Sequence, residues 1–287
     1  MKPKKEKRYS LTRETFQRLM KNKLAVFGLI VLCVLVLTAI FADQIAPYSY
    51  DEMDFLNAYQ SPCKGHIFGT DEFGRDIFSR VVYGSRISLK VGFIAVSISV
   101  VAGGLLGAVA GYYGGWTDNL IMRGMDVIMS IPATLLAISI AAALGAGLTN
   151  LMIATGIASI PTYARIVRAS VLGIKEQEFV EAAKAVGTSD FTILVKHILP
   201  NCLAPIIVQA TLGVAFAILT AAGLSFIGLG IEPPTPEWGA MLSNARTYIR
   251  DYSYMCLFPG LAIAITIFSL NVLGDGLRDA LDPKLRQ

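Results

Sequence analysis

Long uninterrupted runs of apolar residues constrain this chain more than any other feature. Several runs reach about 20 residues, the length that a helix needs to cross the hydrocarbon core of a bilayer. In lipid only helices and closed barrels satisfy every backbone hydrogen bond, and these runs lack the alternation of barrel strands. Charged residues make up only 16% of the 287 residues, whereas a soluble domain typically carries about a quarter. The sequence therefore predicts an all-α polytopic membrane protein in the lipid bilayer.

We expect about six transmembrane helices. They are predicted at residues 24–42, 89–111, 121–145, 149–168, 203–226 and 255–273. The predicted organisation is a basic N-terminal segment (1–23), the first span (24–42), an outer loop (43–88), a five-span core (89–276) with a central loop (169–202), and a tail (277–287). Pro132 is expected to kink the third span, and Gly103, Gly107 and Gly111 predict close helix packing. A cleaved signal peptide is the alternative for the first run, which exceeds the usual apolar core of about 7 to 15 residues.

The distribution of Lys and Arg predicts the orientation. With the amino terminus inside, 18 of these residues fall on the cytoplasmic side and 7 on the outer side. Cytoplasmic loops of membrane proteins carry such an excess. Both termini and the central loop are therefore predicted to be cytoplasmic. The basic segment 1–23 is interpreted as a membrane anchor, and no nucleic-acid partner is expected.

The central loop contains EAAKAVGTSDFTILVKHILP, residues 181–200, which is predicted to form two short helices around Gly187. The predicted apolar faces are Phe179, Ala183 and Val186 in the first helix and Phe191, Leu194, Val195 and Ile198 in the second. Thr188, Ser189 or Asp190 can cap the second helix, and Pro200 is expected to separate it from the next span. Alone, this stretch fits an interfacial hairpin or a helix-turn-helix, although the flanking spans argue against DNA binding.

The pattern Glu-Ala-Ala, three residues, Gly, and a final Leu-Pro resembles the EAA loop of permease subunits of ATP-binding-cassette importers. The matching residues are Glu181, Ala182, Ala183, Gly187, Leu199 and Pro200. His197 stands where the family prefers Ile. The resemblance implies a type I importer permease fold in the plasma or inner membrane, with this loop docked in a cleft of a cytoplasmic ATPase subunit. It also implies a homologous second permease, two ATP-binding subunits that bind the ATP, an extracytoplasmic solute-binding protein, and no cofactor on this chain.

The outer loop contains FGTDEFGRDIFSRVVYGSRISL, residues 68–89. Gly69 and Gly74 have the spacing of a phosphate loop, but Arg75 replaces the required Lys, so the chain is not predicted to be an ATPase. Together with PPTPEWG (residues 233–239) and the C-terminal LGDGLRDALDPKLRQ, this segment resembles the dipeptide, oligopeptide and nickel branch of these permeases. The purely structural alternative is a capped helix start with local pairing among Asp71, Glu72, Arg75 and Asp76.

Short peptides are the predicted cargo, with nickel or a nickel chelate as the alternative. His66 and His197 are predicted to lie in loops on opposite sides of the membrane, so the sequence predicts no histidine-based metal cluster. A membrane-embedded enzyme is disfavoured because no catalytic set appears, and a secondary carrier because few ionisable groups lie deep in the spans. For Cys63 and Cys256 a disulfide and free thiols both stay open, with free thiols favoured.

An apolar stripe follows the fifth predicted span. Its members are Trp238, Met241, Leu242, Ala245 and Ile249. We expect this stripe to lie along the outer membrane surface or at the mouth of the translocation path, next to the binding protein. Simple anchoring of an interfacial helix is an equal alternative.

Overall fold

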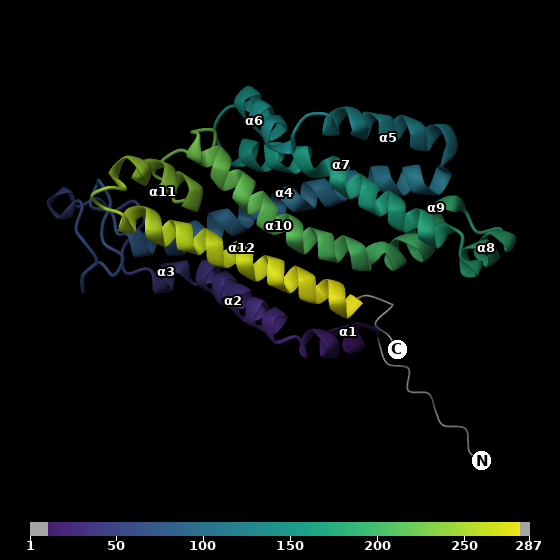
Figure 1. The fold of residues 1–287 in the computed structure, drawn as a ribbon, viewed down its shortest axis with the longest axis horizontal. Helices are drawn as coiled ribbons and strands as arrows, with labels where there is room; N and C mark the ends of the chain where they lie inside the picture. Colours follow the sequence, from purple (N-terminus) through teal and green to yellow (C-terminus); the bar gives the residue numbers. More distant parts are fainter. Residues whose placement is uncertain (1–10, 282–287) are drawn as a thin grey trace, which may run out of the picture.

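The computed structural model describes residues 11–281 as a bundle of helices that is elongated along one axis (Figure 1). Within that range the only β pairing is a single antiparallel bridge between Thr70 and Asp76. The all-α prediction is therefore confirmed for these residues. The predicted N-terminal segment (1–23) and tail (277–287) lie partly outside the described range.

Five long helices run along the bundle (Figure 1). They are α2 (Lys23–Ile40), α4 (Ile77–Tyr113), α7 (Leu148–Lys175), α10 (Leu203–Phe226) and α12 (Tyr254–Leu281). The shorter helices are α1 (Leu11–Leu19), α3 (Ala42–Ile45), α5 (Gly115–Met129), α6 (Ala133–Leu144), α8 (Glu178–Ala185), α9 (Asp190–Thr192) and α11 (Trp238–Ala245). Figure 1 shows α11 and α3 toward one end of the bundle, and α8 and α9 at the other.

Four helical segments of the described chain are long and apolar enough to cross a membrane: α2, α4, residues 190–226 and α12. A fifth is added if α5 and α6, which meet at 84°, count as one bent span. The predicted third span is therefore broken more sharply than the expected kink. Because proline lacks an N–H and disfavours helix in the residue before it, α5 ends at Met129 and α6 begins after Pro132. α7 occupies the predicted fourth span, and a total of six spans stays a prediction.

The glycine stripe of α4 lets α7 approach closely. A Cβ added at Gly107 would lie 2.2 Å from the Ala164 carbonyl oxygen. Added Cβ atoms at Gly103 and Gly111 would lie 2.5 Å and 2.9 Å from atoms of α7. These distances leave no room for a side chain, so the predicted packing role of the stripe is confirmed.

Both ends of the described chain lie on one side of the bundle. Leu19 of α1, Ala25 of α2 and Ala280 of α12 are buried in one cluster. α12 runs from the end that holds α11 toward the end that holds α8 (Figure 1). This arrangement agrees with the expectation that the termini and the central loop share a side, although which side is cytoplasmic stays a prediction.

Candidate functional site

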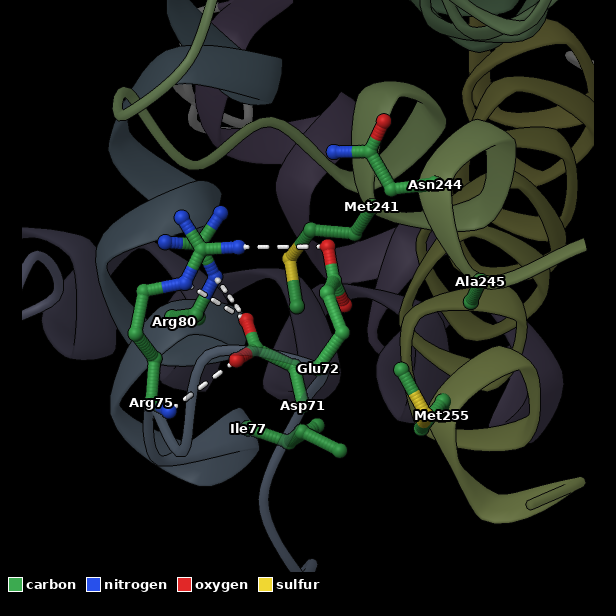
Figure 2. Close-up of a pocket in the computed structure, with 9 residues that line it drawn as sticks. All are labelled: Asp71, Glu72, Arg75, Ile77, Arg80, Met241, Asn244, Ala245 and Met255. Atoms are coloured by element: carbon green, nitrogen blue, oxygen red, sulfur yellow. Dashed lines mark hydrogen bonds and ion pairs between the residues drawn. The ribbon is translucent and has the colours of Figure 1, made fainter. Parts of the chain in front are cut away.

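The loop before α4 folds around a buried ionic cluster, and Figure 2 shows its carboxylates turned toward two arginines. Asp71 Oδ2 lies 2.6 Å from Arg75 Nε and 3.7 Å from Arg80 Nε. Arg75 also lies 3.6 Å from the Glu72 carboxylate. Asp71, Arg75 and Arg80 are 6%, 2% and 3% exposed, and charges so deeply buried need partners. Burial raises the pKa of the Glu72 carboxyl above its ordinary value.

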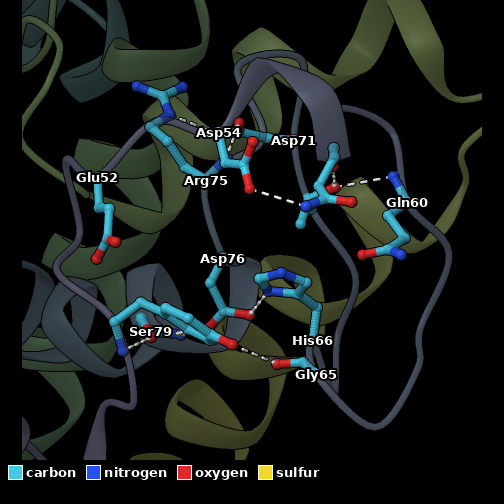
Figure 3. Close-up of polar contacts among 12 residues, drawn as sticks. Glu52, Asp54, Gln60, Gly65, His66, Asp71, Arg75, Asp76 and Ser79 are labelled. Carbon is cyan, nitrogen blue, oxygen red and sulfur yellow. Dashed lines mark hydrogen bonds and ion pairs between the residues drawn. The ribbon is translucent and has the colours of Figure 1, made fainter.

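The same segment caps α4 through Asp76. Asp76 Oδ2 accepts hydrogen bonds from the Ser79 N–H and hydroxyl, both at 2.7 Å, and Oδ1 lies 3.0 Å from His66 Nδ1 (Figure 3). This cap satisfies a donor that the helix start leaves free. Gly74 has a φ of 74°, and a Cβ there would lie 1.8 Å from the Asp54 carbonyl oxygen. The alternative of a capped helix start with locally paired charges is confirmed.

The apolar stripe of α11 faces the interior of the subunit. Trp238, Met241 and Ala245 are buried, Leu242 is partly buried, and Ile249 is 56% exposed. The Trp238 indole N–H donates to the Val81 carbonyl oxygen at 3.0 Å, and α11 packs on α10 and α12. The stripe therefore contributes to the core at the end of the bundle that holds α11, because α10 and α12 cover its apolar side chains. Contact of this region with a binding protein stays a prediction, with Ile249 as the exposed member.

At the opposite end, α8 packs one face onto α4 and α7. Val180 and Ala183 are 0% and 9% exposed and belong to a cluster with residues of both long helices. Phe179 and Val186 are 40% and 80% exposed. The predicted face through Phe179, Ala183 and Val186 is therefore wrong, because α8 has apolar residues on two sides and packs only one of them. We call residues 178–200 the platform.

The chain stays helical from the second half of the platform through Pro200 and into α10. A π-helical stretch (Ile193–Ile198) and a 3-10 turn (Leu199–Cys202) connect α9 to α10. The expected separation at Pro200 is wrong, because these irregular turns accommodate a residue that lacks an N–H. Of the predicted second face, Ile198 is 0% exposed and Phe191 is 75% exposed.

Gly187 ends α8 with a Schellman motif. Its N–H donates to the Lys184 carbonyl oxygen at 2.9 Å, and the Thr188 N–H donates to the Ala183 carbonyl oxygen at 3.1 Å. The φ of Gly187 is 78°, a conformation that glycine adopts without steric cost. Among the described residues, no heavy atom lies within 4 Å of a Cβ added there. The backbone conformation requires this glycine, and the space around it is open.

Polar contacts fix the platform to the long helices. The Tyr112 hydroxyl donates to Asp190 Oδ1 at 2.6 Å. Asp190, one of the predicted caps of the second short helix, therefore binds Tyr112 of α4 with its side chain. Lys184 Nζ lies 5.8 Å from the centroid of the Tyr112 ring, which is within range of a cation–π interaction. Nearby, Arg168 of α7 forms a two-point ion pair with Asp118 of α5 at 2.5 Å and 2.6 Å. The base of the platform is therefore held by both apolar and polar contacts.

The six residues matched to the EAA pattern divide by exposure. Glu181, Ala182, Gly187 and Pro200 are exposed, Leu199 is partly buried, and Ala183 is buried. Together with Val186 and Phe191, the four exposed residues give the platform an exposed surface of mixed apolar and polar character. Such a surface is typical of a protein interaction site.

Comparison with known proteins identifies the family. The family model described as "Binding-protein-dependent transport system inner membrane component" matches residues 103–287, more than half of the chain. The chain belongs to this family. A second model, the N-terminal TM domain of oligopeptide transport permease C, matches residues 10–62. This permease is therefore a multi-pass inner-membrane subunit of an ABC transporter, as the resemblance implied.

Two relatives match nearly the whole permease in sequence, and one solved structure matches most of it in fold. The dipeptide transport system permease protein of Alkalihalophilus pseudofirmus is 52% identical over 274 residues, which cover 96% of this chain and 90% of that protein. The glutathione transport system permease protein of Escherichia coli O157:H7 is 48% identical over 95% of this chain and 90% of its own length. A chain from inward-facing conformations of the MetNI methionine ABC transporter matches with a TM-score of 0.57 and 18% identity, covering 71% of this permease and 96% of that chain. The last match shows a shared fold alone, that of a type I importer permease.

Proposed function

We propose that this permease forms, together with a homologous second permease, the path of an ATP-driven importer for di- and oligopeptides. The names of the relatives support this cargo. The 52% identical relative is named for dipeptide transport, and the 48% identical relative for glutathione, which is itself a tripeptide. Nickel, the alternative cargo, has no support from these names.

The proposed coupling element is the platform, and its two-sided structure is the observation that carries the proposal. Val180 and Ala183 anchor its inner side in the core, while Val186 and Phe191 are 80% and 75% exposed on the other. Burial of such apolar surface against a partner stabilises a complex by about 25 cal/mol per Å². The exposed Glu181 carboxylate offers a charged partner for a basic group. A subunit that binds here would move α4 and α7 with it.

Other subunits complete the proposed assembly. Two cytoplasmic ATP-binding subunits bind and hydrolyse ATP, and each presses on one permease through its platform. An extracytoplasmic solute-binding protein delivers the peptide to the opposite end. In this proposal the permease is a non-catalytic subunit, and it alternates between states that open to either side.

Uptake in whole cells tests the cargo. The gene is deleted and then restored on a plasmid, and uptake of a labelled dipeptide, a labelled oligopeptide and nickel is measured in parallel. We expect peptide uptake to fall on deletion and to return on restoration, with nickel uptake unchanged. Loss of nickel uptake alone would reverse the cargo assignment.

A further inference from the structure

A groove of about 860 Å³ lies between α2, α4, α10 and α12. This volume is within the range of protein clefts that bind small molecules. Among the described residues that line it, only four are not apolar: Arg86, Lys90, Ser97 and Thr211. The Ser97 and Thr211 hydroxyls each donate to the carbonyl oxygen four residues earlier in their own helix, at 2.8 Å and 3.0 Å. Apart from its two cations, the groove therefore offers a ligand only hydrocarbon surface.

One face of α4 forms a wall along this groove. Arg86, Lys90, Phe93, Ser97 and Val101 line it and follow one another at intervals of three or four residues, so they share a face of the helix. Both cations lie at one end of this face. The part from Phe93 to Val101 is about 12 Å long, which is close to half of the hydrocarbon core of a bilayer, about 15 Å. The groove therefore has a charged end and an apolar part as long as one leaflet is thick.

Arg86 joins α4 to the end of α2. Its Nη2 donates to the Ile40 carbonyl oxygen at 2.8 Å and lies 2.9 Å from the Asp43 carboxylate. Its Nε donates to the Ala39 carbonyl oxygen. The guanidinium group therefore closes the charged end of the groove, and Asp43 balances its charge.

Lys90 differs from Arg86, although it lies only one turn further along α4. It is exposed, and within the described chain its ammonium group has no ion pair or hydrogen bond. Because Asp43 balances Arg86, Lys90 leaves this end of the groove with one positive charge in excess. A charge at the edge of a membrane span is stabilised by a partner of opposite sign, and a lysine there can reach toward the polar headgroups. The groove therefore suits an anion that carries a hydrocarbon chain.

A smaller, polar cavity of about 290 Å³ lies at the charged end of the groove. Arg86 lines both spaces, and Asp43, Tyr50, Tyr83 and Thr235 also line the smaller one. Their hydroxyl and carboxylate groups can hydrogen-bond to an uncharged polar group. The two spaces together place hydrocarbon surface, cations and hydroxyl groups in the order in which a phospholipid carries its acyl chain, phosphate and headgroup.

We propose that this groove binds one anionic phospholipid, of the class of phosphatidylglycerol. The phosphate lies beside Lys90, an acyl chain follows the α4 face past Phe93, and the glycerol headgroup occupies the smaller cavity. The single negative charge of this lipid matches the single excess positive charge of the site, whereas phosphatidylcholine has no net charge. A helix of a second permease would have to bring its own carboxylate to Lys90, whereas an anionic phospholipid always carries the phosphate.

The test of the headgroup end measures lipid selectivity. The complete transporter is purified in detergent, freed of loosely held lipid, and incubated with equal amounts of phosphatidylglycerol and phosphatidylcholine that carry the same acyl chains. Native mass spectrometry then gives the ratio of the two lipids that stay bound. We expect Lys90→Gln to lower the ratio of phosphatidylglycerol to phosphatidylcholine about fivefold, the effect of one cation beside an anionic headgroup. Lys64→Gln, which removes an exposed cation outside the groove, should leave it unchanged. The same ratio in wild type and Lys90→Gln would overturn the site.

The test of the apolar part fills the groove. Ser97→Phe places a ring among its lining residues and should lower the amount of phosphatidylglycerol that stays bound. Ser139→Phe on α6 is the matched control, because Ser139 lies outside the groove and its hydroxyl likewise donates to the carbonyl oxygen four residues earlier, at 2.9 Å. It should retain the wild-type amount. Equal amounts of bound lipid in the two variants would overturn the site.

A further measurement identifies the occupant in cell membranes and keeps both cations in place. Phe93 lines the groove and is 69% exposed, so Phe93→p-benzoylphenylalanine adds a photoreactive group there. After irradiation of the complete transporter, we expect the mass of a phospholipid on the α4 peptide. A covalent link from this position to a second permease would overturn the lipid site and assign the groove to that subunit. Neither result depends on the peptide cargo, so this inference and the proposed function can fail separately.

Discussion

The two ends of this permease carry similar sequence signals, glycines among charged residues, but use them in opposite ways. In the outer loop the glycine fits against neighbouring backbone, since a Cβ at Gly74 would lie 1.8 Å from the Asp54 carbonyl oxygen. Its charges are also buried, with Asp71 close to two arginines. In the platform, Gly187 stands in open space, and Phe191 is 75% exposed.

This difference separates a structural motif from an interaction surface. Groups that are satisfied within one chain need no partner, whereas apolar groups that stand exposed on a packed base gain from binding one. The ionic motif before α4 therefore stabilises the fold of the end that holds α11. In the proposed function, the platform is the surface that binds another protein.

The largest expected effect is loss of the buried carboxylate at the outer end. Asp71→Ala leaves Arg75 and Arg80 buried without their shared partner, which we expect to destabilise the permease by about 3–5 kcal/mol. Thermal unfolding of the purified permease in detergent measures this. Asp51→Ala, an exposed acid of the same loop, is the control and should change little. Equal effects of the two substitutions would contradict the structural role of the cluster.

The two glycines should respond differently to alanine. Gly74→Ala places a Cβ against the Asp54 backbone, and we expect little folded permease to be recovered. Gly187→Ala meets open space and suffers only the conformational penalty of positive φ, about 1–2 kcal/mol. The yield of monodisperse permease after solubilisation compares them. A similar yield for both variants would contradict the difference in packing around Gly74 and Gly187.

Thiol labelling compares an exposed and a buried position of the stripe that begins at Trp238. The substitution at the exposed position should destabilise the permease less than the substitution at the buried position. Ile249→Cys should react with a membrane-impermeant reagent added from outside, because Ile249 is 56% exposed. Trp238→Cys should react slowly from either side, because Trp238 is 1% exposed. Labelling of both positions from the cytoplasmic side would invert the predicted topology.

The smallest expected effect is a pH dependence at Glu72. Burial raises the pKa of this carboxyl, so its protonated form is favoured in the folded loop. The folded state is therefore penalised as the pH rises through that raised pKa. Glu72→Gln should remove the penalty, so the variant should gain thermal stability relative to wild type as the pH rises from about 4 to 7. A constant difference across this range would contradict burial as the cause.

Much of the fold could be predicted because apolar length and periodicity are local properties. The fifth span was expected at residues 203–226, and α10 occupies that range. The 84° break before Pro132 could not be predicted, because a proline can kink a helix or end it, and the neighbouring helices decide which. Periodicity also does not show which apolar side of a helix packs, and so the face of α8 that contains Val180 was missed.

The sites show the same limit. The EAA pattern located the platform, and Gly187 was correctly placed at the turn because its conformation depends only on local backbone. The stripe that begins at Trp238 was also recognised, but its burial depends on α10 and α12, which are distant in the sequence.

Association of the ATP-binding subunits with the platform tests the central claim most directly. Tagged permease carrying Ala182→Asp or Gly187→Val is purified, and the co-purified ATP-binding subunits and peptide uptake by the same strain are measured. Leu56→Asp adds a charge at a position of the outer loop that is 97% exposed and serves as the matched control. An unpaired charge at an interface costs about 2–5 kcal/mol. The account predicts normal membrane insertion in all three variants, with loss of both association and uptake only in the two platform variants. Full association and full uptake in both platform variants would show that this surface is not the coupling element.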